Sequence, residues 1–247
     1  MTWSAVGASV VGTSHRTRGT PCQDAIRHAL FGPAKEWLVV AVADGAGSAS
    51  HAEFGATLTC EELVGRVQLA DPHHFLNREA LADLFAEVRP VLLGEAERLA
   101  VQPRALACTA LLAIAGPTGA AFAQIGDGAI VAGVGDGRRV VFWPDPAEYA
   151  NATDFLTDDR YADTLRVEVT TDAVSELAVL SDGLQRLALD YSTRGPHSPF
   201  FDPLFARIHG SDDLPGLADQ LGGFLASARV NERTDDDKTL FLAARRP

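Results

Sequence analysis

The sequence predicts an α+β fold in which two β-sheets pack face to face with helices outside them. Strand patterns gather near the start, the middle and the end of the 247 residues, and helical patterns are grouped between them instead of alternating one by one. Several strands are short apolar runs without a charge, which is typical of strands buried on both faces. Such strands need a layer on each side, and two packed sheets covered by helices supply it.

The bulk composition is that of a folded globular protein. Hydrophobic residues make up 47% of the chain and charged residues 22%, which is ordinary and sufficient for a core. We find no repeats, low-complexity segment or linker, so we expect one domain over residues 1–247. The net charge of −12 disfavours nucleic acid and anionic membranes as partners, because phosphate groups would be repelled.

The chain also lacks the usual signals for export. No basic leader with an apolar stretch precedes residue 10, and no run approaches the roughly 20 apolar residues that span a bilayer. Its three cysteines are widely spaced without a CxxC pattern, which favours reduced thiols over disulfides or zinc. We therefore expect a cytoplasmic protein.

The first part of the chain predicts three strands. Residues 3–12 and 24–31 alternate loosely, and residues 37–43 form a continuous apolar run. Gly32-Pro33 predicts a hairpin between the last two. Residues 12–24 are polar, basic and broken by glycine and proline, which predicts a loop. Its arginines fit either a solvated loop or an anion clamp, because guanidinium suits phosphate.

Two helices are expected next. Ser50 and Glu53 form a capping-box pattern before a helix to about residue 69. Asn77 precedes a second helix whose apolar residues recur at three- and four-residue steps, and Pro90 would kink it.

Strands then return, followed by a helix and a last strand. We expect an antiparallel meander of four strands, near 107–115, 119–125, 129–134 and 138–143. Further strands are expected at 164–170, 176–181 and 239–243, with a helix capped by Ser211 before the last one. Residues 144–163 are polar and Pro-rich without a clear period, and irregular segments of this length are often functional.

Aspartates mark the ends of several apolar strands. Asp44 and Asp182 follow two strands directly, Asp127 follows a third after one glycine, and residues 235–237 precede the last strand. If the last strand is antiparallel to the others, all of these carboxylates share one sheet edge. Carboxylates without nearby cysteine or paired histidine form a hard-oxygen site that selects Mg²⁺, Mn²⁺ or Ca²⁺ over Zn²⁺ or Cu²⁺. Two such ions suit attack of water on a phosphoryl group.

Five motifs in this order resemble the metal-dependent Ser/Thr protein phosphatases, the PPM or type 2C family, in its bacterial short form. They are Gln23-Asp24-Ala25, Asp44-Gly45-Ala46-Gly47, Gly126-Asp127-Gly128, Ser181-Asp182-Gly183 and Asp236-Asp237-Lys238-Thr239. The resemblance covers nearly the whole chain. It implies a four-layer α-β-β-α sandwich with two central, mainly antiparallel sheets and two metal ions, Mn²⁺ or Mg²⁺, at one end.

The resemblance implies that Asp44, Asp182 and Asp236 are the catalytic metal ligands. Asp44 would bridge both ions, and the Gly45 carbonyl would bind one of them. Asp182 and Asp236 would hold the other ion. Hydrolysis of phosphoserine and phosphothreonine on proteins, by a water that bridges the two ions, is the implied activity.

Further metal contacts follow from the same resemblance. Asp24 would act through bound water, and Asp127 lies where the family binds a weaker third ion. Residues 144–163 coincide with the family's variable flap, which touches substrate. One departure concerns Gln23, because many members have glutamate there, and neutral glutamine is a weaker partner for a hydrated ion.

Other departures concern the proton donor and the phosphate clamp. Some members have a histidine, proposed as general acid, where this chain has Ala46, so His15 or His51 would have to substitute. The family's phosphate-binding arginine corresponds to Gly19, which leaves Arg16 or Arg18, with His15, as the candidates for binding phosphate.

These departures leave two alternatives to a protein phosphatase. One is a metal-binding pseudophosphatase that acts as an interaction module, and the other is a phosphatase for small phosphorylated metabolites. The implied partners are a phosphoprotein substrate and, by analogy with short bacterial members, a cognate protein kinase and a von Willebrand A-type domain protein.

Overall fold

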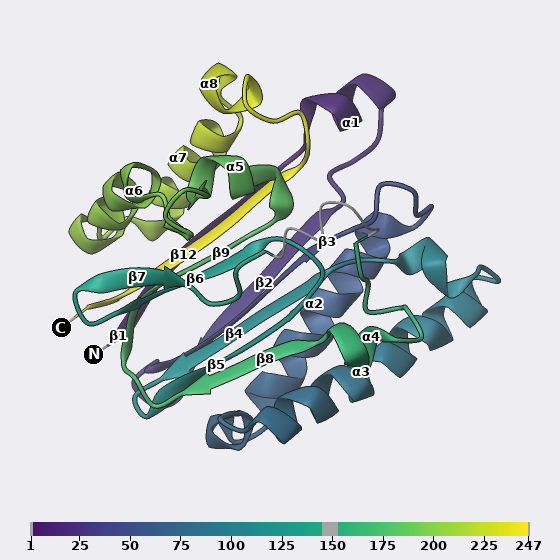
Figure 1. Cartoon of the computed structure of the whole chain (residues 1–247), viewed down its shortest axis with the longest axis horizontal. Coiled ribbons are helices and arrows are strands. Elements are labelled where there is room, and N and C mark those ends of the chain that lie inside the picture. Colours follow the sequence, from purple (N-terminus) through teal and green to yellow (C-terminus); the bar gives the residue numbers. More distant parts are fainter. Residues whose placement is uncertain (1, 145–152, 247) are drawn as a thin grey trace.

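Two five-stranded sheets lie face to face between helices in the computed structural model, which describes residues 2–144 and 153–246 (Figure 1). The first sheet has the order β1 (Thr2–Val10), β12 (Lys238–Arg246), β9 (Val174–Leu180), β6 (Ala129–Val134) and β7 (Gly137–Val140). The second has the order β2 (Asp24–Phe31), β3 (Trp37–Asp44), β4 (Ala110–Gly116), β5 (Gly119–Ile125) and β8 (Arg166–Thr170). All neighbouring strands in both sheets are antiparallel.

Helices cover the outer face of each sheet. The long helices α2 (Ala52–Leu69) and α3 (Arg78–Arg98) lie on the second sheet, and α6 (Ser198–Gly210) and α7 (Leu214–Leu225) lie on the first (Figure 1). The shorter elements are α1 (Thr13–Arg18), α4 (Tyr161–Thr164), α5 (Gln185–Ala188), α8 (Ala228–Asn231), the 3₁₀ turns η1 (Pro72–Phe75), η2 (Pro103–Leu106) and η3 (Asp182–Leu184), and the small ribbon of β10 (Leu189–Asp190) and β11 (Gly195–Pro196). The predicted α+β fold with four layers is confirmed.

The strand β3 shows why the sheets need cover on both faces. Leu38, Val40 and Val42 contribute to the core between the sheets, whereas alternate residues pack against α2 and α3. All seven residues before Asp44 are buried. Each buried aliphatic side chain contributes on the order of 1.5–3 kcal/mol, so this strand anchors both layers and fixes the position of the carboxylate at its end.

Two of the predicted helix starts differ from the observed ones. Asn77 does cap α3, where its side chain accepts the N–H of Glu79 at 2.7 Å. The capping-box prediction for α2 was wrong, because the Oγ of Ser50 bonds the ring of His51 at 3.0 Å and no side chain caps the helix. Ser211 does not cap α7 either: the side chain of Asp213 accepts the N–H of Gly216.

Two larger expectations need correction. The four strands of the predicted meander divide between the sheets, since β4 and β5 pair in the second sheet and β6 and β7 pair in the first. Residues 13–18 of the predicted loop form the helix α1. A residue far away in the sequence holds this helix in place, since the N–H of Ser14 donates to the carbonyl of Asp235 at 2.9 Å. The predicted flap lies partly outside the described residues. Within those residues no helix is long and apolar enough to cross a membrane.

Candidate active site

Acidic residues from four separate segments meet at one end of the two sheets. Because β3 and β5 run in the same direction, Asp44 and Asp127 lie at the same end of the second sheet. Asp182 follows β9 and Asp236 precedes the antiparallel β12 in the first sheet. These four residues line a single cavity of about 380 Å³. The predicted single sheet edge is thus corrected to the shared end of two sheets.

Asp44 is held by the backbone around it. Its N–H donates to the Oγ1 of Thr109 at 2.9 Å, and its carbonyl accepts the N–H of Thr109 at 2.8 Å. The next residue, Gly45, packs so closely on the start of α2 that a Cβ would lie 2.7 Å from the backbone of Ala52. Burial raises the pKa of the Asp44 carboxyl well above its usual range, and the neighbouring charges of Asp24 and Asp182 raise it further.

Asp24 lies behind this cavity rather than in its wall. It begins β2 directly opposite Asp44 in the register, and it is buried. Its Oδ2 accepts the hydroxyl of Ser181 at 2.7 Å, whereas its buried Oδ1 has no hydrogen-bond partner. Burial raises the pKa of this carboxyl to about 7, against the hydrogen bond from Ser181, which lowers it. An unpartnered buried oxygen of this kind suits an ordered water or a cation.

Close backbone packing brings Asp182 and Asp236 together. A Cβ on Gly183 would lie 2.0 Å from the carbonyl oxygen of Asp237, and a Cβ on Gly12 would lie 2.4 Å from the carbonyl carbon of Asp236. Only glycine fits at either place. Buried Lys238 donates through its Nζ to the carbonyl of Asp236 at 3.3 Å. Burial and the charge of Asp182 raise the pKa of Asp236.

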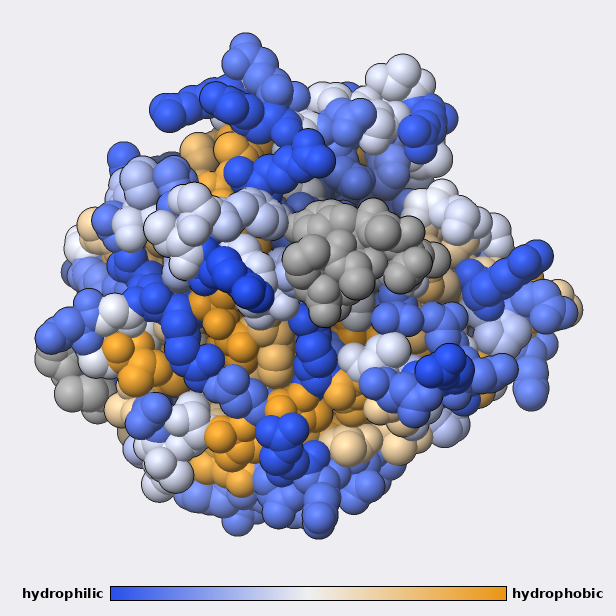
Figure 2. All heavy atoms as spheres, in the orientation of Figure 1, coloured by the Kyte–Doolittle hydropathy of each residue, from blue (hydrophilic) through white to orange (hydrophobic). Residues whose placement is uncertain are grey.

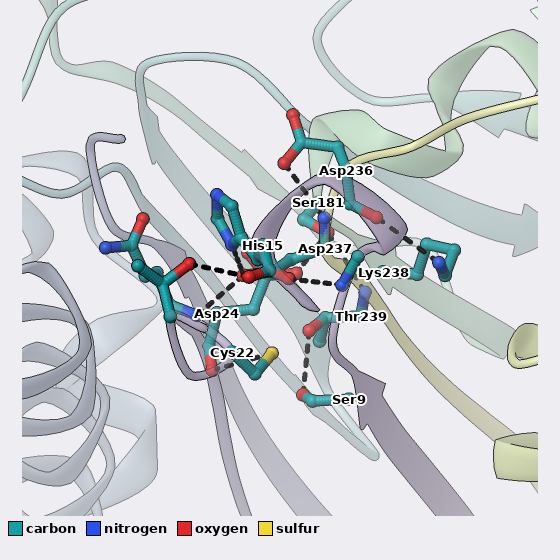
Figure 3. A network of polar contacts seen from close by, with 12 residues as sticks. Ser9, His15, Cys22, Asp24, Ser181, Asp236, Asp237, Lys238 and Thr239 are labelled. Atoms are coloured by element: carbon teal, nitrogen blue, oxygen red, sulfur yellow. Dashed lines mark hydrogen bonds and ion pairs between the residues drawn. The ribbon is translucent and has the colours of Figure 1, made fainter. Parts of the chain in front are cut away.

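Asp237 anchors the start of the chain to this end of the fold (Figure 3). Its carboxylate accepts the N–H of Gly12 at 2.5 Å, the N–H of Gln23 at 2.6 Å and the Nδ1 of His15 at 2.8 Å. All three contacts join residues more than 200 positions apart. Figure 3 shows the other ring nitrogen of His15 pointing away from Asp237.

The candidate phosphate-binding residues separate into two groups. His15 and Arg18 line the carboxylate cavity, on the last turns of α1. Arg16 and His51 are not among the described residues that line it. The lining of the cavity therefore combines carboxylates with a guanidinium and an imidazole, an arrangement suited to an anionic substrate held against cations.

The chemistry of the donor set fits a hard cation. The oxygens Oδ1 of Asp24 and Oδ1 of Asp182 are buried without a hydrogen-bond partner. The pKa values of Asp44 and Asp236 are raised first by burial and then by the nearby charge of Asp182, a repulsion that a divalent cation would offset. In residues 2–144 and 153–246, no three His, Cys, Asp or Glu side chains are already arranged as a complete metal-binding group.

Several residues of the site were not assigned a role from the sequence. Asp235 lines the cavity, Asp237 and Ser181 support it, and Thr109 holds Asp44. Asp237 had a detectable signal, because an aspartate next to a buried strand must find partners for its charge. Nothing near Thr109 in the sequence distinguishes it from an ordinary strand residue.

Fold and site together define a class of enzyme, a phosphatase built on an α-β-β-α sandwich, and comparisons with known proteins specify the family. Residues 11–226 match the family described as Protein phosphatase 2C. The chain is 39% identical over 249 residues to Serine/threonine-protein phosphatase 3 of Escherichia coli (strain K12), covering 98% of each protein. The chain therefore belongs to the protein phosphatase 2C family.

Solved structures agree with this assignment at the level of the fold. A variant of a bacterial serine phosphatase matches with a TM-score of 0.69 at 16% identity, over 100% of both chains. The serine/threonine phosphatase Stp1 from Staphylococcus aureus matches with a TM-score of 0.68 at 16% identity, over 100% of this chain and 96% of that one. The predicted family, fold and enzyme class, a phosphoprotein phosphatase, are confirmed.

Proposed function

We propose that this protein hydrolyses phosphoserine and phosphothreonine on proteins, in a single domain that uses Mn²⁺ or Mg²⁺. The observation that carries the proposal is the joint lining of one cavity by Asp44, Asp127, Asp182 and Asp236 with Arg18 and His15. The 39% identical relative, named a Ser/Thr protein phosphatase, supports the substrate class.

The carboxylates divide between the ions in the proposed site. Asp44 would serve two ions, with the Gly45 carbonyl on one and Asp182 and Asp236 on the other. Asp24, behind the cavity, would act through water, and its unpartnered Oδ1 supports that role. When bound, the ions supply Lewis-acid stabilisation of the phosphoryl oxygens and activation of water at neutral pH.

A weaker third ion is proposed at Asp127. Its Oδ2 accepts the hydroxyl of Thr153 at 3.2 Å, so the carboxylate is held at the cavity wall by the segment that follows the undescribed residues. This contact also supports the proposed flap role of residues 144–163, since Thr153 and Phe155 in the described part of that stretch line the cavity.

Arg18 and His15 would contact the substrate. Arg18 would hold the phosphate oxygens, and the charge-assisted hydrogen bonds would orient the phosphorus for attack. The Nε2 of His15 would give its proton to the departing serine or threonine oxygen. Asp237, which accepts from Nδ1, fixes the ring orientation, so it is a positioning residue.

The alternatives are less well supported. A pseudophosphatase is not favoured, because Asp44, Asp127, Asp182 and Asp236 line one cavity and the similar relative is named as a phosphatase. Gln23, whose Oε1 is buried without a partner, remains the departure that could slow turnover. Hydrolysis of small phosphorylated metabolites is a second candidate. The proposed partners besides the substrate are a cognate kinase and a von Willebrand A-type domain protein, in the cytoplasm.

A phosphopeptide assay tests the proposal. Release of phosphate from phosphoserine and phosphothreonine peptides should require added Mn²⁺ or Mg²⁺, stop in EDTA, and fall at least 100-fold in Asp44→Asn and in Asp182→Asn. Asp83→Asn, an exposed position on α3, is the matched control and should keep full activity. Turnover that survives chelation, or a preference for small phosphate esters over every peptide, would contradict it.

A further inference from the structure

A second, larger cavity lies on the opposite side of the first sheet from the sheet–sheet interface. It has a volume of about 820 Å³ and opens between α5, α6, α7, α8 and the outer face of β1 and β12. Its floor is apolar and includes Phe200, Leu204, Leu217, Leu221, Phe224 and Val230. Figure 2 shows hydrophobic surface between hydrophilic side chains over α7 and α8, at the upper left of the molecule. We call this cavity the helical groove.

The helical groove is bordered by four exposed arginines on separate segments. Arg186 lies on α5, Arg207 on α6, Arg229 on α8, and Arg233 just after α8. Among the described residues none of the four forms an ion pair, and Arg207 contacts only a neutral partner, the Oε1 of Gln220, at 2.8 Å. Asp190 is the one acidic residue among the described residues of the lining, and it already accepts the N–H groups of Ser192 and Thr193 in its own turn.

This concentration of arginines without ion pairs contrasts with the charge of the whole molecule. The whole chain carries a net charge of −12. Arginines elsewhere commonly lie against carboxylates: Arg27, Arg66, Arg89, Arg98, Arg138, Arg139, Arg160 and Arg246 each form an ion pair. The groove arginines thus remain available although acidic side chains are plentiful, so the rim is electrostatically complementary to an acidic ligand.

We propose that the helical groove is a docking surface for a segment of a partner protein that presents apolar side chains flanked by several acidic residues. An amphipathic helix places apolar anchors at three- and four-residue spacing into a groove of this kind and leaves its other positions for contacts at the rim. A fatty acid would fill the floor but has one carboxylate, which cannot engage arginines distributed over α5, α6 and α8. The four arginines therefore favour a segment with several carboxylates.

The groove is separate from the phosphatase site but adjacent to it along the chain. Among the described residues, the linings of the groove and of the carboxylate cavity have none in common. Arg186 follows Asp182 by four positions, and Arg233 precedes Asp236 by three. A docked segment would thus touch the two stretches that carry these carboxylates, while substitution at the rim leaves the cavity intact.

Binding of a model helix tests the proposal. The probe is a fluorescein-labelled helical peptide with leucines at alternating three- and four-residue spacing and glutamates at the remaining positions, and its matched control has lysines in place of glutamates. Fluorescence anisotropy with the intact protein should show at least tenfold tighter binding of the glutamate peptide, weakening as salt rises. The double variant Arg207→Glu, Arg229→Glu should lower that affinity at least tenfold, and Phe224→Ala should lower it as well.

Controls separate docking from general effects. Arg78→Glu, at an exposed position on α3 in the opposite helical layer, should bind the glutamate peptide like the wild type. Circular dichroism and thermal unfolding establish that each variant is folded. Equal binding of both peptides, or an equal loss in Arg78→Glu, overturns the proposal. Binding of a fluorescent fatty acid without binding of either peptide also overturns the proposal and assigns the groove to a small amphiphile. Self-association that the double variant abolishes overturns it as well and assigns the groove to a second copy of the chain.

Discussion

The Nδ1 of His15 lies 2.8 Å from the Oδ2 of Asp237, and both side chains are buried at the edge of the carboxylate cavity. Asp237 also accepts the N–H groups of Gly12 and Gln23, so one carboxylate satisfies three donors from the first 23 residues. It thereby connects the beginning of β12 to both ends of the segment that carries α1. The position of His15 and Arg18 relative to the carboxylates depends on this connection.

Replacing Asp237 should destabilise the protein and displace α1. Asp237→Ala leaves three donors without an acceptor, two of them buried, and loss of a buried charged partner costs about 3–5 kcal/mol. We expect a fall of that order in the free energy of unfolding, measured by urea denaturation. Asp235→Ala is the matched control, because that neighbouring side chain is exposed, and it should change stability by less than about 0.5 kcal/mol. Similar losses in both variants would show that Asp237 is not an anchor.

The proposed proton transfer from His15 predicts a dependence on the leaving group. His15→Gln removes the donor, so hydrolysis of a phosphoserine peptide, whose alkoxide leaves poorly, should slow about 100-fold in kcat. p-Nitrophenyl phosphate has a stable leaving group and should be affected only a few-fold. A purely structural role would slow both substrates alike, so equal losses would argue against proton transfer. His51→Gln, outside the cavity lining, should leave both rates unchanged.

The two arginines of α1 offer a matched test of phosphate binding. Arg18 lines the cavity and Arg16 does not, although both are exposed and lie two residues apart. A charge-assisted hydrogen bond contributes about 1.5–3 kcal/mol, so Arg18→Ala should raise KM for a phosphopeptide about tenfold or more. Arg16→Ala should change KM less than twofold in the same steady-state assay. A larger rise in KM for Arg16→Ala than for Arg18→Ala would instead assign phosphate binding to Arg16.

The carboxylate site was predictable because local rules decide where an aspartate next to a buried strand must lie. Asp44 and Asp182 follow apolar strands directly, and their charges can only be placed at the ends of the sheets. Which strands share a sheet was not predictable, since β5 and β6 are both apolar on each face. The chain changes sheets between them at Gly126 and Gly128, which have φ values of +78° and +94° and could equally have formed a hairpin turn.

The helix α1 escaped prediction for a different reason. Its six residues contain no apolar stripe, and a helix this short is not stable by itself. Contacts with the far end of the chain supply the stability, through the carbonyl of Asp235 and the carboxylate of Asp237. Positions of His15 and Arg18 in the site follow from those contacts, so local sequence could name both residues as candidates but could not distinguish Arg18 from Arg16.

Stability without metal should fall as pH rises. The pKa of Asp24 is raised from 3.8 to about 7, and those of Asp44 and Asp236 are raised as well. Between pH 4 and 7 the folded protein therefore binds protons that the unfolded chain has released, and the free energy of unfolding decreases through this window. For Asp24 alone the loss is on the order of 4 kcal/mol when complete above pH 7. His28 acts in the opposite direction: its side chain is exposed, but partial desolvation of the ring, which lies beside Phe241, lowers its pKa.

Thermal unfolding in EDTA should therefore give a higher Tm at pH 5 than at pH 8. Mn²⁺ or Mg²⁺ should raise Tm more at pH 8, where the ionised carboxylates can bind cations without displacing protons. Asp24→Asn removes the titration of one of these buried carboxyls, so it should flatten the EDTA profile and raise Tm at pH 8 above that of the wild type. His28→Gln is the control for imidazole titration. It removes a contribution that rises with pH, so the fall in Tm from pH 5 to pH 8 in EDTA should be steeper in this variant. A Tm that rises from pH 5 to 8 in EDTA would show that folding does not raise the pKa values of these carboxyls.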